Sequence, residues 1–285
     1  MKPSPFTHHR PGTIDDAIRL LGQFGDEDVR ILAGGQSLIP MMAFRLARPT
    51  HLIDINNVRE LEGIKIEEHL IKIGALCRHE DVRRLPIPGT SGLLLRSIVS
   101  NIAHRPIRTR GTFCGSIVHA DPASEWCLTA LTLDGVMNVV GPDGRRDIKA
   151  SDWFRGAMTT AIEASELLVT VSLPLLSEET RFAFKEFSRR AGDFAIASAL
   201  VVFEILHGKM INVRVGIGGA EDRPRRMTAA EEFLEGCEPS TELFAGAAST
   251  VAAELVPMED INTNASYRRN LSATLVRRAL EEASA

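Results

Sequence analysis

The spacing of apolar residues near the start of the chain predicts a helix followed by two short buried strands. Residues 13–24 carry apolar side chains at positions 14, 17, 18 and 21, which recur at helical spacing. The runs 29–32 and 51–55 are short, apolar and rich in β-branched residues, as buried strands are. A further apolar stretch, 38–46, separates them. The pattern therefore predicts a small β-α-β unit whose first strand runs into a glycine loop.

The rest of the chain changes from a mixed pattern to strands followed by helices. Up to residue 174 we expect strands at 64–66, 70–74 and 167–173, a helix at 93–102, a helix starting at Asp121-Pro122, and a hairpin over 136–148. Beyond the boundary at 175–180 we expect an antiparallel meander at 181–188, 195–206 and 210–216, then helices at 229–234, 243–255 and 267–283.

This pattern predicts an α+β chain of two domains. Residues 1–176 form the first domain, with subdomains at about 1–57 and 58–176, and residues 177–285 form a domain of antiparallel sheet plus helices. A length of 285 residues is sufficient for two such cores.

Composition and charge exclude several classes of protein. The chain is 44% hydrophobic and 25% charged, with a formal net charge of −4, which argues against a nucleic-acid surface or a polybasic membrane anchor. No apolar run approaches the roughly 20 residues of a membrane span. The first residues contain no apolar stretch typical of a signal peptide. We therefore expect a cytoplasmic protein.

The cysteines and histidines do not form a recognisable metal motif. Cys77, Cys114, Cys127 and Cys237 include no CxxC pair, so we predict four free thiols. The eight histidines supply no set of three or four ligands at metal-binding spacing. No metal site is predicted, and any redox cofactor is not held by cysteine.

Two glycine-containing stretches are candidates for anion binding. They are 33–37 (AGGQS) and 111–116 (GTFCGS), each after an apolar segment and each with a hydroxyl-bearing residue. Glycine lets backbone N–H groups approach an anion closely, so a pyrophosphate could lie between the two loops. For either loop alone, a simple tight turn is the alternative interpretation. Neither matches GxGxxG or GxxxxGK[ST].

Four stretches together resemble one family. Residues 31–42 (ILAGGQSLIPMM), 108–125 (RTRGTFCGSIVHADPASE), 184–194 (FKEFSRRAGDF) and 267–280, with YRRNL and RRAL, resemble the FAD-binding (medium) subunit of the molybdenum hydroxylase family. That family includes the carbon monoxide dehydrogenase medium subunit and the xanthine dehydrogenase FAD domain. The resemblance covers nearly the whole chain, and implies an FAD-binding domain of the PCMH/vanillyl-alcohol-oxidase-like type.

The resemblance also implies roles for individual residues. Ile102 would contact the flavin region, Glu125 would accept hydrogen bonds from ribose or adenine, and Leu168 and Lys185 would make further FAD contacts. Phe194 would stack on the flavin ring, with Asp193 beside it in the same loop. The FAD pyrophosphate would be wrapped by Ile31, Leu32, Ala33, Gly34, Gly35, Gln36, Ser37, Leu38, Thr112, Cys114, Gly115 and Ser116.

Each of these roles has a plainer alternative. Glu125 could be a first-turn acid favoured by the helix dipole, and Phe194 an ordinary core residue. Lys185 could stabilise negative charge on a reduced flavin or be a solvated strand lysine. Cys114 stands where the family commonly has a glycine, which makes the loop conformation there an open question. The basic run at 105–110 could bind phosphate, meet an acidic partner or be solvated.

By this resemblance the chain is an electron-transfer subunit. It would take electrons from the [2Fe-2S] clusters of a small subunit, after a large molybdenum–pterin subunit has oxidised the substrate, and pass them to an external acceptor. The assembly would be a dimer of heterotrimers. The rivals are a free-standing FAD-dependent reductase or oxidase of the same fold and a flavin-free scaffold subunit. The sequence leaves the substrate and the final acceptor open.

Overall fold

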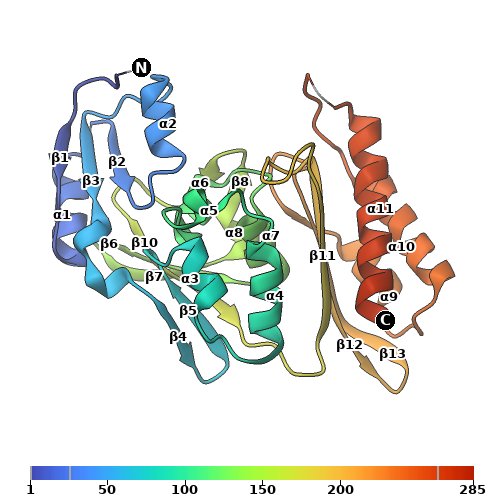
Figure 1. The fold of residues 1–285 in the computed structure, drawn as a ribbon. Coiled ribbons are helices and arrows are strands. Elements are labelled where there is room, and N and C mark those ends of the chain that lie inside the picture. Colours follow the sequence, from blue (N-terminus) through green and yellow to red (C-terminus); the bar gives the residue numbers. More distant parts are fainter. Residues whose placement is uncertain (1, 26, 262) are drawn as a thin grey trace.

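The computed structural model describes residues 2–25, 27–261 and 263–285. Figure 1 shows three groups of elements along the molecule: the N-terminal strands and α1 at one end, a second sheet in the middle, and the last helices at the other end. Within the described residues, no helix is long and apolar enough to cross a membrane. The mixed helix and sheet arrangement, with an antiparallel sheet and helices at the C-terminal end, is the α+β fold class that the sequence predicts.

The N-terminal unit is a three-stranded parallel sheet covered by a helix. Its strands β1 (Thr7–His9), β2 (Val29–Leu32) and β3 (His51–Asp54) lie in the order β1-β3-β2. Helix α1 (Ile14–Gln23) is capped by Thr13, whose hydroxyl accepts from the Asp16 N–H at 3.1 Å. Helix α2 (Leu38–Ala43) follows the first glycine loop. The predicted β-α-β unit is confirmed, with β1 as an additional strand.

The middle of the molecule is a five-stranded antiparallel sheet with β10 (Leu167–Pro174) at its centre. The order is β4-β5-β10-β6-β7, where the other strands are β4 (Ile64–Glu67), β5 (Leu70–Gly74), β6 (Val136–Gly141) and β7 (Gly144–Lys149). Most residues of β10 are buried, which explains its nearly continuous apolar run. The short elements packed around the sheet are α3 (His79–Arg84), α4 (Gly89–Val99), α5 (Arg105–Arg108), α6 (Phe113–His119), α7 (Glu125–Thr132), α8 (Ala150–Trp153), β8 (Phe154–Gly156), β9 (Thr159–Thr160) and the 3₁₀ turns Ile55–Asn57 and Arg59–Leu61.

Two local predictions in this region are wrong. The stretch 111–116 is not a glycine loop throughout, because helix α6 begins at Phe113. The segment at Asp121-Pro122 does not start a helix: the Asp121 carboxylate accepts from the Ala123 N–H at 2.9 Å, which forms a turn. The helix starts at Glu125 instead, capped by the hydroxyl of Ser124.

The C-terminal part is an antiparallel sheet with helices on one face. The sheet order is β11-β12-β13-β14, formed by Arg181–Phe187, Ala197–Leu206, Lys209–Gly218 and Arg225–Arg226. Helices α9 (Thr228–Leu234), α10 (Thr241–Glu254) and α11 (Ala265–Ser284) complete the chain. In Figure 1, α10 and α11 lie on the side of β11 that is turned away from α4 and α7. The predicted meander and final helices are confirmed within a few residues.

The C-terminal sheet contributes to two separate hydrophobic cores. Leu200 and Val202 of β12 belong to the core of the first 173 residues, whereas Val201 and Phe203 belong to the core formed with the last helices. This alternation is the two-residue period of a strand buried on both faces. The two faces of β12 belong to different cores because one face packs on α7 and the other packs on α11.

Candidate flavin site

One cavity of about 870 Å³ connects the N-terminal unit to the C-terminal sheet. This volume is typical of a small-molecule or cofactor site. Its wall includes every residue predicted to contact FAD except Lys185. These are Ile31, Leu32, Ala33, Gly34, Gly35, Gln36, Ser37, Leu38, Ile102, Thr112, Cys114, Gly115, Ser116, Glu125, Leu168, Asp193 and Phe194. The fold thus gathers onto one surface residues that lie up to about 160 positions apart in sequence.

The two predicted loops touch each other directly. A Cβ on Gly34 would lie 2.4 Å from the carbonyl oxygen of Arg110 and 2.7 Å from Cα of Gly111. Only glycine permits this approach of one backbone to another. Gly34 therefore serves the contact between the loops, a role different from leaving space for a ligand. Gly35 has a φ of +70°, a conformation that favours glycine.

A polar bridge holds the loops in this position. The side-chain amide of Asn56 donates to the carbonyl of Ala33 at 2.8 Å. The guanidinium of Arg78 donates to the Asn56 side-chain oxygen and to the carbonyl of Arg110, both at 2.6 Å. These bonds link β2, the turn after β3 and the segment before α6. Asn56 and Arg78 were not predicted as site residues, since their contribution depends on contacts between distant segments.

The first loop presents unpaired backbone donors to the cavity. Within the described part of the chain, the N–H groups of residues 34–38 have no acceptor in the protein, whereas the N–H of Ile39 donates to the carbonyl of Gly35. Such a run of free amides is a site for an anion, and phosphate oxygens are suitable acceptors. This arrangement fits the pyrophosphate of a dinucleotide.

The second segment is the N-terminus of α6. The Thr112 hydroxyl caps the helix by accepting from the Gly115 N–H at 3.0 Å. Cys114 is helical, so its φ is negative and no glycine is needed there. Its thiol is buried and donates to the Ile73 carbonyl at 3.5 Å, and burial raises its pKa well above the ordinary range. Cys114 thus contributes backbone to the cavity, and its thiol is an inert core group.

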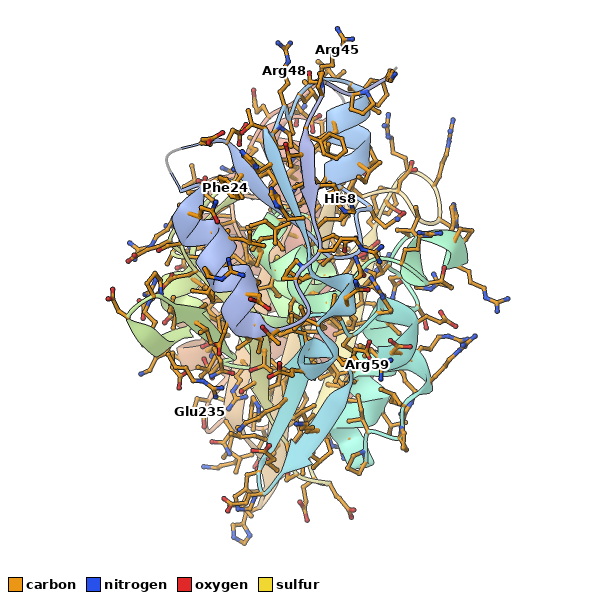
Figure 2. All side chains as sticks on the ribbon, turned by 90° about the vertical axis from the view of Figure 1, so that its left-hand side faces the viewer. His8, Phe24, Arg45, Arg48, Arg59 and Glu235 are labelled. Carbon is orange, nitrogen blue, oxygen red and sulfur yellow. The ribbon has the colours of Figure 1, made fainter. Side chains whose placement is uncertain are left out.

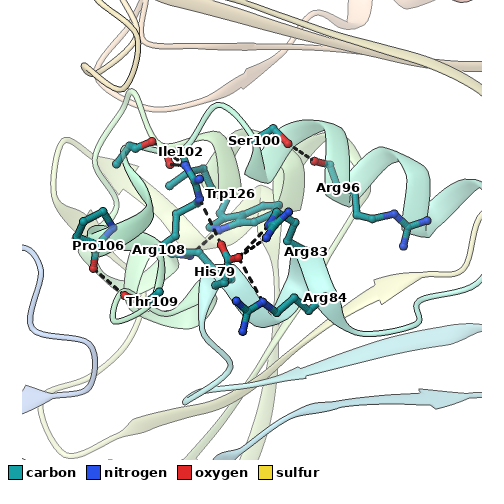
Figure 3. Close-up of polar contacts among 12 residues, drawn as sticks. His79, Arg83, Arg84, Arg96, Ser100, Ile102, Pro106, Arg108, Thr109 and Trp126 are labelled. Carbon is teal, nitrogen blue, oxygen red and sulfur yellow. Dashed lines mark hydrogen bonds and ion pairs between the residues drawn. The ribbon is translucent and has the colours of Figure 1, made fainter.

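A polar network around the buried Glu80 carboxylate fixes the segment that carries Ile102. Arg108 donates to the carbonyls of Ile102 and Ala103 at 2.9 and 2.8 Å, and its Nε lies 3.6 Å from the Glu80 carboxylate. Glu80 is also bonded by Arg83, at 2.9 Å (Figure 3). The network supports the positive φ of 39° at Ala103. Arg108 is therefore a partly buried structural cation, a role outside the three alternatives considered for the basic run.

His79 is a cavity residue that the sequence did not reveal. Burial, together with the nearby charges of Arg108 and Arg78, lowers the pKa of His79 to about 4, so the ring is neutral at neutral pH. Its Nδ1 accepts from Trp126 Nε1 at 2.9 Å (Figure 3). The hydrogen of the neutral ring therefore lies on Nε2. His79 lines the cavity, and this nitrogen lies against Gly111. It is suited to donate to a ligand oxygen.

The far end of the cavity is formed by the loop between β11 and β12. Asp193 and Phe194 are exposed there, with Phe194 at 69% exposure. The loop contacts the first domain, because a Cβ on Gly192 would lie 2.6 Å from the ring of His104. Phe194 is thus no core residue, and an exposed aromatic ring at a cavity mouth can cover a planar ligand.

Lys185 is the one predicted residue that the structure places elsewhere. Its ammonium group pairs with the Glu282 carboxylate of α11, on the face of β11 opposite the cavity. The strand period of two turns Phe182, Phe184 and Glu186 toward the first domain and Lys185 away from it. The structure thus places Lys185 away from the cavity, and its contact with FAD stays a prediction.

The N-terminal end of the cavity is formed by residues around β2 and α2, including Leu46 and Arg48. Figure 2 shows Arg45 and Arg48 at the outer tip of this unit and Phe24 at the end of α1. Phe24 stacks on His51, and the ring of His51 lies 2.9 Å from that of His9. Among the described residues, no group of three or more His, Cys, Asp or Glu is arranged to hold a metal ion. The four cysteines are free thiols, as predicted.

The fold has two domains, and residues from both line the one cavity described above. Residues 4–176 match the family "FAD binding domain in molybdopterin dehydrogenase", and residues 182–283 match "CO dehydrogenase flavoprotein C-terminal domain". The chain belongs to the FAD-binding medium subunits of the molybdenum hydroxylase family, and FAD is its cofactor.

Named relatives match the chain over its full length. The nicotine 6-hydroxylase medium subunit of Paenarthrobacter nicotinovorans is 36% identical, covering 100% of this chain and 99% of the relative. The carbon monoxide dehydrogenase structure from Hydrogenophaga pseudoflava aligns with a TM-score of 0.96 at 34% identity, covering 100% and 99% of the two chains. The quinoline 2-oxidoreductase of Pseudomonas putida 86 aligns at 0.92 and 31% identity, covering 100% and 98%. A xanthine dehydrogenase FAD-binding subunit of Escherichia coli is more distant, at 24% identity over 97% and 95%.

Proposed function

We propose that this chain is the electron-transfer subunit of a molybdenum-dependent hydroxylase or dehydrogenase. It would receive electrons from the [2Fe-2S] clusters of a small partner subunit, which are supplied by substrate oxidation in a large molybdenum–pterin subunit, and deliver them to an external acceptor. The supporting observation is the cavity that joins the two domains, with free amides at one end and an exposed aromatic ring at the other.

The residues of this chain have three tasks in that function. The amides of residues 34–38 would hold the pyrophosphate, and the Nε2–H of His79 would donate to a nearby ligand oxygen. Arg108 would keep Ile102 in place against the ring system through its bonds to the backbone. Phe194 and Asp193 would control access at the mouth of the cavity. Bound FAD supplies a centre that can take electrons singly and release them in pairs.

The substrate site belongs on another subunit in this proposal. The names of the relatives refer to nicotine, carbon monoxide, glyceraldehyde and caffeine, although the sequence identities to this chain lie between 31% and 36%. Chains that serve such different substrates share this fold, so the fold does not select the substrate. We further propose that the assembly is a dimer of heterotrimers in the cytoplasm, as expected from the sequence.

Purification of the tagged chain from its native host tests the proposal. We expect co-purification of two other subunits, with FAD, molybdenum and iron in the same fraction, and bleaching of the flavin absorption when an oxidisable substrate is added. A panel of aldehydes and N-heterocycles is the starting set. The matched control is the isolated chain, which should retain FAD but show no bleaching with the same panel.

Other outcomes would identify the rivals. Steady NAD(P)H oxidation by the isolated, FAD-loaded chain, without partner subunits, would indicate a free-standing reductase. A chain that purifies with the complex but carries no flavin would indicate a scaffold. Either result contradicts the electron-transfer assignment.

A further inference from the structure

A group of acidic residues lies where the two domains meet beside the cavity. Glu125 is the first residue of α7, Asp121 lies in the turn before that helix, and Glu186 comes from β11 of the other domain. Glu125 and Asp121 both line the cavity. Glu125 is only 9% exposed, so the carboxyl that faces the cavity is almost wholly within the protein.

Glu186 does not line the cavity, and its carboxyl group is incompletely paired. One of its carboxyl oxygens, Oε2, is fully buried and has no hydrogen-bond partner among the described residues. Ser198 pairs with Glu186 across the β11–β12 ladder and shares its face of the sheet. The Ser198 side chain is completely buried, and its hydroxyl also lacks a partner within the described part of the chain. Such unpaired polar groups are rare in native structures unless they have a role.

The charges around the two glutamates are negative. In the described ranges, neither Glu125 nor Glu186 forms an ion pair with an Arg, Lys or His. The groups that act on them are Asp121 from the turn before α7, which acts on Glu125, and Glu125 itself, which acts on Glu186. Lys185, the neighbour of Glu186 in sequence, points to the opposite face and pairs with Glu282.

These surroundings favour the protonated form of both groups. Burial, with a smaller effect of Asp121, raises the pKa of Glu125 to about 7. Burial and the charge of Glu125 raise the pKa of Glu186 to about 8. Two interacting carboxyl groups of this kind titrate as a pair.

We propose that Glu125 and Glu186 form a proton-holding pair in the cavity wall, in which Glu125 exchanges a proton with the bound cofactor and Glu186 replenishes it. The inference rests on the proposed function, which supplies the electrons. When two electrons reach the cofactor, the O–H bond of Glu125 breaks, its proton balances part of the added negative charge, and a carboxylate remains. Glu186 then gives its proton to Glu125 and regains one from solvent. Glu125 would be a catalytic residue, and Glu186 would act through it.

Redox titration of the FAD-loaded protein with dithionite tests this pair without requiring partner subunits. The flavin midpoint potential is measured from pH 5.5 to 9 in the wild type, Glu186→Gln and Glu125→Gln. We expect the pH at which the potential changes slope to move from near 8 in the wild type to near 7 in Glu186→Gln, where only Glu125 titrates. The change of slope should be lost in Glu125→Gln. The control is Glu179→Gln, an exposed glutamate before β11, which should match the wild type.

The pH dependence of unfolding of the cofactor-free chain gives a second measurement. Both pKa values are raised above the ordinary 4.5, so the folded state binds more protons than the unfolded state between pH 4.5 and 8. The contribution of the pair to stability is therefore complete below pH 4.5 and is lost as the pH rises to about 8. The decline should be shallower in Glu186→Gln than in Glu179→Gln.

The outcomes separate this inference from the proposed function. Wild-type potential profiles in both Glu186→Gln and Glu125→Gln, or unfolding profiles identical to that of Glu179→Gln, would overturn the pair. Loss of FAD by Glu125→Gln would prevent the redox titration of that variant. In that case the potential profile of Glu186→Gln alone tests the pair, because Glu186 does not line the cavity. A confirmed pair in a chain that purifies without molybdenum or iron–sulfur subunits would refute the electron-transfer assignment and leave the pair intact.

Discussion

At the scale of single residues, the site depends on the immediate surroundings of each position, which decide whether a side chain fits there. Gly34 is needed because the backbone of residues 110–111 occupies the space of a Cβ. Cys114, which departs from a pattern that commonly has glycine, is tolerated because its position is helical and its thiol points into the core. The motif alone treats these two positions alike, and the contacts around them distinguish the two.

Gly34→Ala should weaken both the fold and the retention of flavin. The added methyl group would meet backbone atoms of the second segment at 2.4 and 2.7 Å, which cannot move as a flexible side chain does. We expect a loss of about 1–3 kcal/mol in the free energy of unfolding, the usual cost of overpacking, and a lower flavin-to-protein ratio. Urea unfolding and the visible flavin absorption measure the two effects.

Gly22→Ala is the matched control for this substitution. Gly22 lies in α1, is exposed, and has nothing within 4 Å of an added Cβ. We expect a gain of roughly 0.4–1 kcal/mol, because alanine restricts the unfolded chain and favours the helix. Equal stability and equal flavin content in Gly34→Ala and Gly22→Ala would contradict the loop-contact role of Gly34.

At the scale of secondary-structure elements, the period of β11 decides which residues can take part in the site. Phe182, Phe184 and Glu186 face the first domain, and the side chains between them face α11. A family motif that runs through a strand therefore contains residues with unrelated surroundings. Neighbouring positions in such a motif should not be assigned a shared role from sequence alone.

Lys185→Ala should leave the flavin content unchanged. Its ammonium group lies against Glu282, and both side chains are partly exposed, at 30% and 55%, so we expect a stability loss of at most about 1 kcal/mol. The flavin-to-protein ratio and urea unfolding are again the measurements. Loss of flavin in this variant, with stability retained, would instead support the predicted contact of Lys185 with FAD.

At the scale of the whole molecule, the cavity depends on how the two hydrophobic cores, one in each domain, are placed relative to each other. The C-terminal sheet approaches α7 through glycines: a Cβ on Gly216 would lie 2.0 Å from the Thr132 hydroxyl and 2.7 Å from a methyl of Leu128. This contact sets the position of the β11–β12 loop relative to the first domain.

Gly216→Ala should disturb the joint between the domains. The added methyl group would push the sheet from α7, so we expect a loss of about 1–3 kcal/mol in stability and weaker flavin binding. Thr132→Ala removes the closest atom, and its hydroxyl has no partner to lose among the described residues. The double variant should therefore recover part of the loss. If the stability changes of Gly216→Ala and Thr132→Ala simply add in the double variant, Gly216 and Thr132 are not in tight contact.

The sequence by itself determined the local elements and the family. Strands such as 29–32 and 70–74 and the helix at 14–23 follow from apolar spacing and capping residues, which act over a few positions. Short elements such as α3 and α5 were missed, because their stability depends on tertiary contacts and their patterns are too short to be periodic. The glycine and FAD motifs were found because they are contiguous in the chain.

Only the tertiary structure decided which of the predicted residues face the cavity and which others join them. Lys185 points away from the cavity because of the direction of its strand, and Arg78 and His79 join the site through hydrogen bonds to segments 32 and 47 positions away. Burial and the charges of distant neighbours set the pKa of a histidine or a glutamate, and these quantities do not exist until the chain has folded. The sequence therefore supplied the cofactor class, and the fold supplied the chemical state of the groups around it.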